Sequence, residues 1–485
     1  MADPGRVARG ASLLAWLERE GCEHCVRLGE TPGAGGVGVF ASRDVERGEV
    51  LISCPTRTVI SAAETRLDLD EGMAAFVGAM DEIRVPRDCA PPGASGGSPE
   101  GDPLDDSTRM QLVLLRERHI AETTPLLSGD ESDARKRKRD ENVRFSGYWS
   151  PYVRALPGDE LVASLPLSWS ESDIHKRLEG TALFAEVQTE RAKCASLAAA
   201  LAAHKVFSAF PPDAFGVGRI KWARAVFWSR AIALPLAGWG RGGPHGSHDM
   251  KKKTSPGTKR SSGDDGALTP LLDMCNHAPG ISAGTSLQTR GASWRLVATR
   301  RFVKDEEVRI DYGGKGNGEL LTRHGFVIPN NPFDTCLFRV GKEKKSFLLH
   351  RGVREWREFP PGLRDAARRA LADEGNDGDD DGKRRGELSF LAATARRLAD
   401  AAATTAAPRD DASDAVAEED ETKNRALKSR FVPDASGFAT STPFLAERAC
   451  VIYRESQRSL LRDLGDLAAE TIEAETGRLD DDDKR

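Results

Sequence analysis

Three polar side chains that can bind a ligand stand together at the end of an apolar segment, residues 268–277 (LTPLLDMCNH). They are Asp273, Asn276 and His277. An Asn amide both donates and accepts hydrogen bonds, and the two ring nitrogens of a His have different roles. The pattern indicates a polar turn that binds a ligand, with a plain backbone-capping turn as the structural alternative.

A tyrosine is the second candidate. Tyr312 follows a run of alternating apolar and charged residues in 301–314 (RFVKDEEVRIDYGG) and stands directly before Gly313 and Gly314. This pattern predicts a strand that runs into a turn, with the phenol at the end of the strand. A buried tyrosine that caps the strand is the alternative.

Two further elements supply candidate residues. In 31–55, glycines precede two short β-type runs, 37–41 and 50–52. A dinucleotide-binding fingerprint needs a strand before its glycines and a helix after them, so this order counts against a Rossmann unit. Arg230 lies at the end of a helix predicted over 219–231, where a cation offsets the helix dipole.

A metal site is not expected. Cys22, His24 and Cys25 have the spacing of half a site, but no second Cys-x-x-Cys pair occurs in the sequence. His277 and Asp273 likewise lack further ligands of the kind that zinc requires. Eight cysteines without a regular framework fit ordinary thiols in a reducing compartment.

Three blocks together resemble one protein family. They are Asp-Met-x-Asn-His at 273–277, Glu-x-x-x-x-Tyr-Gly at 307–313, and 317–334 (NGELLTRHGFVIPNNPFD). Their residue types and spacing resemble the split SET-domain protein methyltransferases of the Rubisco large-subunit lysine methyltransferase type. The resemblance implies an α+β fold in which a β-rich SET domain is interrupted by a helical insert and followed by an all-α C-terminal domain.

The resemblance and the changes in composition divide the chain into four segments. We expect an N-terminal helix and the N-terminal SET segment in 1–60, and a helical insert with disordered loops in 61–260. The C-terminal SET segment follows in 261–335, and a helical substrate-binding-like domain with flexible inserts in 336–485. Stretches rich in Gly, Ser, Pro and charged residues, such as 85–108 and 239–266, mark inserts.

The resemblance also assigns roles to single residues. It implies that S-adenosylmethionine is bound by a glycine-flanked loop, a helix-end arginine, the polar turn and an aromatic ring: Gly36, Val37, Gly38, Arg230, Asp273, Asn276, His277, Tyr312 and Phe326. Tyr312 is the implied catalytic residue. Ile232 and His324 are implied on the acceptor side, and the apolar Ile232 favours lysine over histidine. His324 and Gly35 depart from the family pattern.

Methyl transfer from a sulfonium is an in-line displacement, so the acceptor nitrogen needs a free lone pair. A lysine, with a pKa near about 10.4, must first lose a proton. A dry channel assists by lowering the lysine pKa, and positioning contributes much of the rate. The Tyr312 hydroxyl can hydrogen-bond the amine or steer the methyl group without being a strong base.

We therefore expect an S-adenosylmethionine-dependent protein N-methyltransferase that modifies a lysine of a non-histone protein. A histidine acceptor is the alternative within the same fold. A catalytically silent SET-like docking module is the alternative from a different class. The departures from the family pattern at Gly35 and His324 leave this alternative open.

Composition sets the remaining expectations. A chain of 485 residues is long enough for two or more domains. A net charge of −5 argues against a nucleic-acid partner. The sequence contains no run of about 18 apolar residues, so a membrane span is not expected. We expect a monomer whose C-terminal helical domain docks a protein substrate. The expected location is cytoplasmic, with the nucleus, through the basic run 135–139, and the plastid as alternatives.

Overall fold

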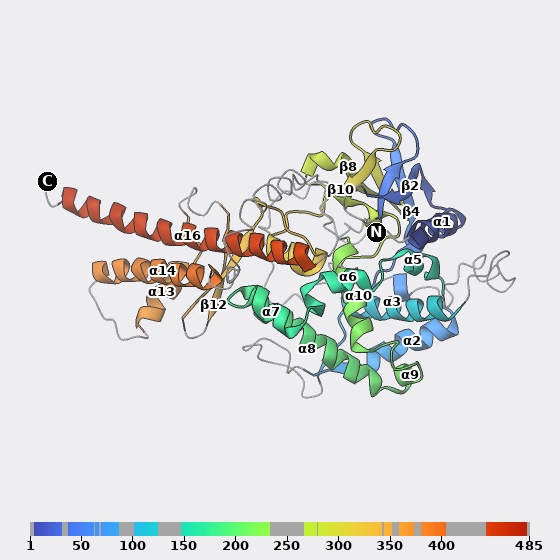
Figure 1. Cartoon of the computed structure of the whole chain (residues 1–485), viewed down its shortest axis with the longest axis horizontal. Helices are drawn as coiled ribbons and strands as arrows, with labels where there is room; N and C mark the ends of the chain where they lie inside the picture. Colours follow the sequence, from blue (N-terminus) through green and yellow to red (C-terminus); the bar gives the residue numbers. More distant parts are fainter. Residues whose placement is uncertain are drawn as a thin grey trace, which may run out of the picture. The chain divides into compact units, whose positions relative to one another are not determined.

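The computed structural model describes residues 4–31, 37–62, 64–66, 69–86, 101–124, 147–232, 266–278, 280–341, 344–351, 358–372, 380–403 and 443–482. The chain forms two compact units, drawn in Figure 1. The first unit comprises 1–163 and 189–313, and the second comprises 164–188 and 314–485. Gly36, the basic run 135–139 and most of the predicted insert 239–266 lie outside the described residues.

Two four-stranded sheets carry the site of the first unit. Their strand orders are β1-β4-β9-β8 and β2-β3-β10-β7. The first sheet consists of β1 (Glu23–His24), β4 (Val50–Pro55), β8 (Thr285–Arg290) and β9 (Ser293–Ala298). The second consists of β2 (Val26–Glu30), β3 (Val37–Ala41), β7 (Asn276–His277) and β10 (Glu307–Ile310). The strands predicted from the runs at 37, 50 and 301 are therefore present.

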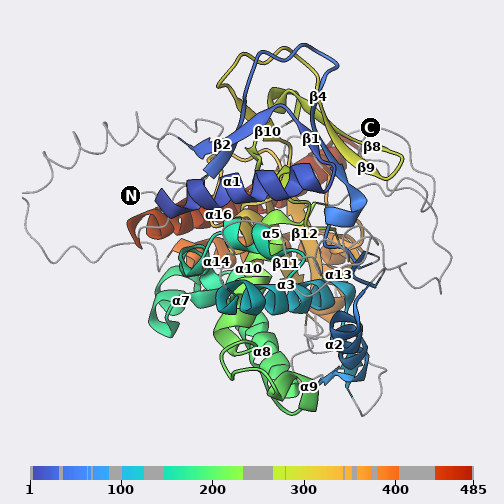
Figure 2. The same ribbon diagram turned by 90° about the vertical axis from the view of Figure 1, so that its right-hand side faces the viewer.

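Helices cover these strands, as the N-terminal half of the sequence predicts. Figure 2 shows α1 between the strands and the helices α3, α5 and α10. The helices of this unit are α1 (Pro4–Arg19), α2 (Glu71–Glu82), α3 (Asp106–Thr123), α5 (Ser150–Ala155), α6 (Asp159–Ser164), α9 (Lys205–Ser208) and α10 (Val217–Arg230). The side chain of Asp105 accepts the backbone N–H of Thr108 at 2.6 Å, which caps α3. A short β5–β6 pair (Arg84–Val85, Asp102–Pro103) precedes this helix.

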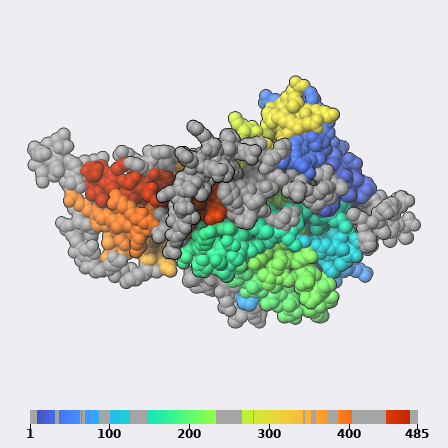
Figure 3. Space-filling model, viewed as in Figure 1, coloured from blue at the N-terminus to red at the C-terminus, as the bar shows by residue number. Residues whose placement is uncertain are grey.

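The second unit is built around two long helices. In Figure 3 they appear side by side, α14 in orange and α16 in red. The elements are α7 (Glu171–Leu178), α11 (Asn317–Glu319), a π-helix (Leu320–His324), β11 (Thr335–Val340), β12 (Lys345–His350), α13 (Leu363–Ala372), α14 (Asp380–Ala403) and α16 (Pro443–Asp482). A further helix, α8 (Ala182–Ala202), runs across the division between the units, as does α6 at its last residue, Ser164.

The structure confirms the α+β fold class with one correction. The C-terminal segment is not all-α, because β11 and β12 form an antiparallel hairpin there. The hairpin buries alternate residues, Cys336, Phe338 and Val340, against the helices. This two-residue period is the pattern of a strand with one buried face.

The units also divide the chain differently from the four predicted segments. Residues 164–188 lie in the predicted insert but belong to the second unit. There, Ile174 and Leu178 of α7 pack in one apolar cluster with Tyr453 of α16. Among the described residues, no helix is both long and apolar enough to cross a membrane.

Candidate functional site

Three neighbouring strands bring together candidate residues that are far apart in the sequence. β7 pairs in parallel with β10, with Asn276 opposite Arg309. On its other side β10 pairs antiparallel with β3, with Glu307 opposite Phe40. β3, the polar turn and the end of β10 therefore meet in one sheet of the first unit.

Gly38, in β3, lies against a cluster of polar side chains. The amide nitrogen of Asn276 donates to Glu307 Oε1 at 2.6 Å and to Thr31 Oγ1 at 3.2 Å. A Cβ added to Gly38 would lie 2.9 Å from each of these two oxygens and 3.2 Å from the Asn276 nitrogen. A side chain at this position therefore requires the polar cluster to shift, which explains the glycine. Val37 is the first residue of β3.

A strained turn delivers Asn276 and His277 to the sheet. Leu271 has a φ of 72°, in the left-handed region that non-glycine residues rarely adopt. A single 3₁₀ turn over Leu272–Met274 follows it and leads directly into β7. The segment is buried throughout, so the predicted polar turn is part of the interior of the unit.

Tyr312 lies two residues after the end of β10 and contacts this turn. Its hydroxyl donates to the carbonyl of Cys275 at 2.9 Å, and its backbone N–H donates to Nδ1 of His277 at 3.2 Å. The next residue, Gly313, has a φ of 89°, which is the predicted turn. The tyrosine surface is only half-buried, yet desolvation of the hydroxyl raises the Tyr312 pKa above its ordinary value. The phenol is therefore neutral at physiological pH.

Arg230 and Tyr152 hold Asp273 from two helices. Arg230 ends α10 and donates from Nη1 to the backbone carbonyl of Asp273 at 2.9 Å. Tyr152, in α5, donates its hydroxyl to Asp273 Oδ2. The other carboxylate oxygen, Oδ1, and the Nε of Arg230 are buried and lack a hydrogen-bond partner. Burial raises the pKa of Asp273 to about 6, and the Arg230 charge and the Tyr152 hydrogen bond oppose the rise.

Ile232 follows Arg230 at the edge of the described chain. Its backbone pairs with that of Ala267, with N–H to O distances of 2.9 and 3.0 Å in the two directions. This bridge ties the end of α10 to the segment that leads into the polar turn. The side chain of Ile232 is half-buried.

Two predicted site residues belong to the second unit. His324 ends the π-helix and Phe326 follows Gly325, whose φ is 78°. Both side chains are buried, with ring centroids 6.0 Å apart. Their roles beside the acceptor and the donor stay predictions.

The cysteines of the N-terminal region have partners other than metal. Cys22 Sγ lies 3.2 Å from Cys54 Sγ, and Cys25 Sγ lies 3.7 Å from the carbonyl oxygen of Leu51. Within the described ranges, no three His, Cys, Asp or Glu side chains are grouped so that they could hold a metal ion.

Sequence reasoning missed three contributors to this site. The aromatic residues in 148–157 (YWSPYVRALP) predict a buried core segment, and Tyr152 is buried, but its hydroxyl contacts Asp273. Thr31 and Glu307 hold the Asn276 amide, although neither belongs to a recognisable ligand pattern. The spacing Glu307-x-x-x-x-Tyr312 was the one available signal for Glu307.

Comparisons with known proteins agree with this arrangement. Residues 36–313 match the family model described as SET domain. Actin-histidine N-methyltransferases from Dasypus novemcinctus and Gallus gallus are each 25% identical over 213 residues. The alignments cover 43% of this chain and 32% and 31% of those proteins. The aligned region is thus about a third of the length of these curated relatives.

Solved structures resemble the chain over most of its length. The structure of Rubisco LSMT bound to AdoMet has a TM-score of 0.57 and 17% identity, and the match covers 96% of this chain and 92% of that one. The SET domain of LSMT bound to lysine and AdoHcy has a TM-score of 0.56 and 16% identity, with 96% and 91% covered. At these identities the likeness is one of fold.

Proposed function

The chain belongs to the SET-domain family, and on that basis we propose that it is a protein N-methyltransferase that uses S-adenosylmethionine. The observation that carries the proposal is that Gly38 and Asn276 meet in one sheet, with Tyr312 against the polar turn and Arg230 bonded to Asp273. The family resemblance implies that each of these five residues binds the donor and that Tyr312 is also catalytic.

The residues of the first unit fit the donor chemically. Gly38 has no side chain, so Thr31, Asn276 and Glu307 can lie against its backbone, and their hydrogen bonds hold the Asn276 amide in place for the donor. The guanidinium of Arg230 retains a buried Nε with no partner, which suits the carboxylate of the donor. The bound donor would supply an electrophilic methyl group on a positively charged sulfur.

The acceptor side favours a neutral nitrogen. The neutral Tyr312 hydroxyl can exchange its bond with Cys275 for one with the incoming nitrogen. The open Oδ1 of Asp273 can accept an N–H from the same group. An amine placed among these buried groups is more easily deprotonated, because desolvation disfavours the ammonium form.

We propose lysine as the acceptor, supported by the apolar Ile232 near Arg230. Histidine is the second candidate, because the curated relatives are named actin-histidine N-methyltransferases. A neutral imidazole already has a free lone pair near pH 7, so it needs no prior loss of a proton.

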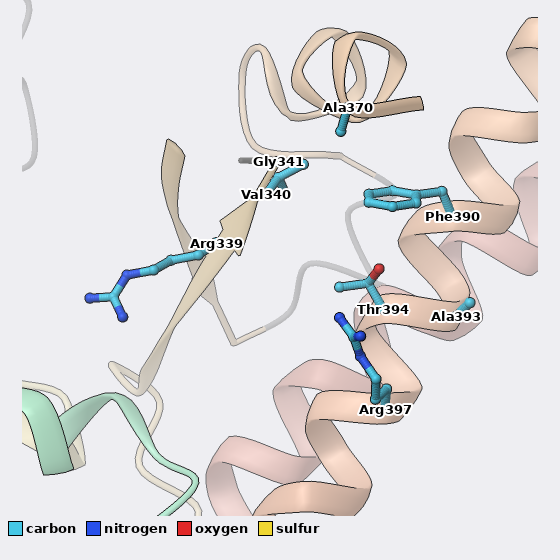
Figure 4. Close-up of a pocket in the computed structure, with 8 residues that line it drawn as sticks. All are labelled: Arg339, Val340, Gly341, Ala370, Phe390, Ala393, Thr394 and Arg397. Atoms are coloured by element: carbon cyan, nitrogen blue, oxygen red, sulfur yellow. The ribbon is translucent and has the colours of Figure 1, made fainter. Parts of the chain in front are cut away.

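We also propose that the second unit docks the protein substrate. A hollow of about 440 Å³ lies between the end of β11, α13 and α14 (Figure 4). It is lined by Arg339, Val340, Gly341, Ala370, Phe390, Ala393, Thr394 and Arg397. The half-buried Phe390 ring and the two exposed arginines suit a substrate segment that carries an apolar anchor and acidic residues.

Docking is tested by charge reversal. We expect Arg397→Glu to raise KM for the protein substrate about tenfold and to leave the Kd for S-adenosylmethionine unchanged. Arg396→Glu is the matched control, because Arg396 is equally exposed but does not line the hollow. Equal KM values for the two variants would remove the hollow from substrate binding.

The activity itself is tested with a labelled donor. Purified protein is incubated with methyl-labelled S-adenosylmethionine and a cell extract, and the modified residue is located by mass spectrometry. We expect label on lysine, whereas label on histidine supports the second candidate. Absence of both label and saturable donor binding would contradict the function and favour a silent docking module.

We propose a cytoplasmic monomer, which fluorescence imaging of the tagged chain and light scattering would check.

A further inference from the structure

Tyr152 connects the helices of the first unit to Asp273 of the candidate site. It lies in α5, which packs against α1 and α3, and its ring is fully buried. Its hydroxyl donates to Oδ2 of Asp273, a residue 121 positions further along the chain. A buried tyrosine needs a partner for its hydroxyl, and here the partner is a carboxylate of the site.

The two oxygens of the Asp273 carboxylate differ. Oδ2 accepts from Tyr152, whereas Oδ1 is buried without a partner. Arg230 holds the backbone carbonyl of the same residue at 2.9 Å, so it fixes the main chain and leaves Oδ1 open. A buried carboxylate oxygen without a donor is unfavourable unless a ligand supplies one.

Other titratable groups face this carboxyl from each neighbouring element. They are Arg230 of α10, Tyr152 of α5, Cys54 of β4, Cys275 beside β7, and Tyr312 after β10. Arg230 is the one cation among them. Burial raises the pKa values of Tyr152, Tyr312 and Cys275, and the hydrogen bond with Cys22, followed by burial, raises that of Cys54, so these groups are neutral near pH 7.

We propose that Tyr152 is a positioning residue that fixes one oxygen of Asp273, so that the other accepts an N–H from the substrate nitrogen next to Tyr312. This inference rests on the proposed function and adds a residue to the same site. Tyr152 does not touch the reacting atoms, and it acts through Asp273. Protonation of Asp273 at Oδ1 would replace this acceptor with an O–H donor, so the reaction rate should fall at acidic pH.

Removal of the Tyr152 hydroxyl should change the Asp273 pKa in a predictable direction. Hydrogen bonds to the ionised form lower a carboxyl pKa, so their loss raises it. Burial already places the Asp273 pKa at about 6. We expect Tyr152→Phe to move the acid midpoint of the rate profile upward by about one pH unit, which is a roughly tenfold loss of rate on the acid side.

The experiment uses the full chain, labelled S-adenosylmethionine and a cell extract as the source of acceptor, from pH 5 to 9. Tyr148→Phe is the matched control, because the buried Tyr148 donates its hydroxyl to a different carboxylate, Glu20, at 2.8 Å. We expect the midpoint to rise in Tyr152→Phe alone, with an unchanged donor Kd at pH 8. A wild-type midpoint in Tyr152→Phe, or an equal rise in Tyr148→Phe, would overturn the inference.

A second measurement separates this inference from the proposed function. If the wild-type chain methylates nothing, the protonation of Asp273 can still be followed by infrared titration. The Asp273 band is identified by its absence in Asp273→Asn. The band should titrate at higher pH in Tyr152→Phe than in the wild type, and coincident titrations would refute the Tyr152–Asp273 link without any activity.

Discussion

Gly38→Ala is the sharpest perturbation of the site. The added methyl group would lie 2.9 Å from Glu307 Oε1 and from Thr31 Oγ1, and 3.2 Å from Asn276 Nδ2. Cβ atoms are essentially never found as close as 2.9 Å to such oxygens, so the cluster must open. Glu307 cannot yield easily, because its second oxygen accepts from Arg309 at 2.6 Å.

The expected cost follows from this geometry. Overpacking of a close-packed interior costs about 1–3 kcal/mol, and separation of the Asn276–Glu307 hydrogen bond adds to the loss. We expect the free energy of unfolding to fall by about 2–3 kcal/mol. If Asn276 no longer presents its amide to the donor, affinity for S-adenosylmethionine should fall at least tenfold, which corresponds to about 1.4 kcal/mol.

Urea denaturation and calorimetric titration with S-adenosylmethionine measure the two effects. Gly78→Ala is the matched control, since Gly78 lies on the exposed face of α2 with nothing within 4 Å of an added Cβ. That substitution should stabilise the helix by up to about 1 kcal/mol and leave donor affinity unchanged. A Gly38→Ala protein with the wild-type urea midpoint and donor Kd would refute the close approach at Gly38.

Other predictions concern stability. Arg454→Met should lower the free energy of unfolding by about 3 kcal/mol or more in urea denaturation, because the buried guanidinium donates to three backbone carbonyls in the second unit. Burial raises the Glu117 pKa from 4.5 to about 7, so its contribution to stability is fully present below pH 4.5 and is lost as pH rises to about 7. The wild type should lose about 3 kcal/mol over that range relative to Glu117→Gln; parallel curves would contradict this. Diamide should join Cys22, which precedes β1, and Cys54 of β4, because their Sγ atoms lie 3.2 Å apart, and the disulfide should stabilise the chain by about 3–4 kcal/mol. Peptide mapping that finds both thiols free would contradict it.

Much of the site follows from local sequence patterns. Tyr312 was expected at the end of a strand because charged and apolar residues alternate before it and glycines follow, and it lies there. The end of the predicted helix at Arg230 also lies beside the polar turn. Both predictions needed only the local spacing of apolar residues and a family resemblance that lies in residues close together in the sequence.

Contacts between distant segments were beyond this reasoning. The aromatic segment around Tyr152 predicts a buried ring, but no local pattern identifies the carboxylate that its hydroxyl meets. The second unit takes up residues 164–188 because Leu178 and its neighbours find their apolar partners on α16, far along the chain. The β11–β12 hairpin was missed because a helical expectation for the whole C-terminal segment overrode its alternating apolar residues.

The central claim is that the Tyr312 hydroxyl acts on the methyl transfer and that donor binding does not depend on it. Calorimetric titration with S-adenosylmethionine, combined with transfer of labelled methyl groups, tests it directly in Tyr312→Phe. The account predicts a donor Kd within about twofold of the wild type, because the phenol donates to Cys275 and not to a residue that binds the donor, together with at least a hundredfold loss of transfer. A Tyr312→Phe protein with unchanged methyl transfer would contradict it. So would a variant in which weaker donor binding alone explains the lower transfer.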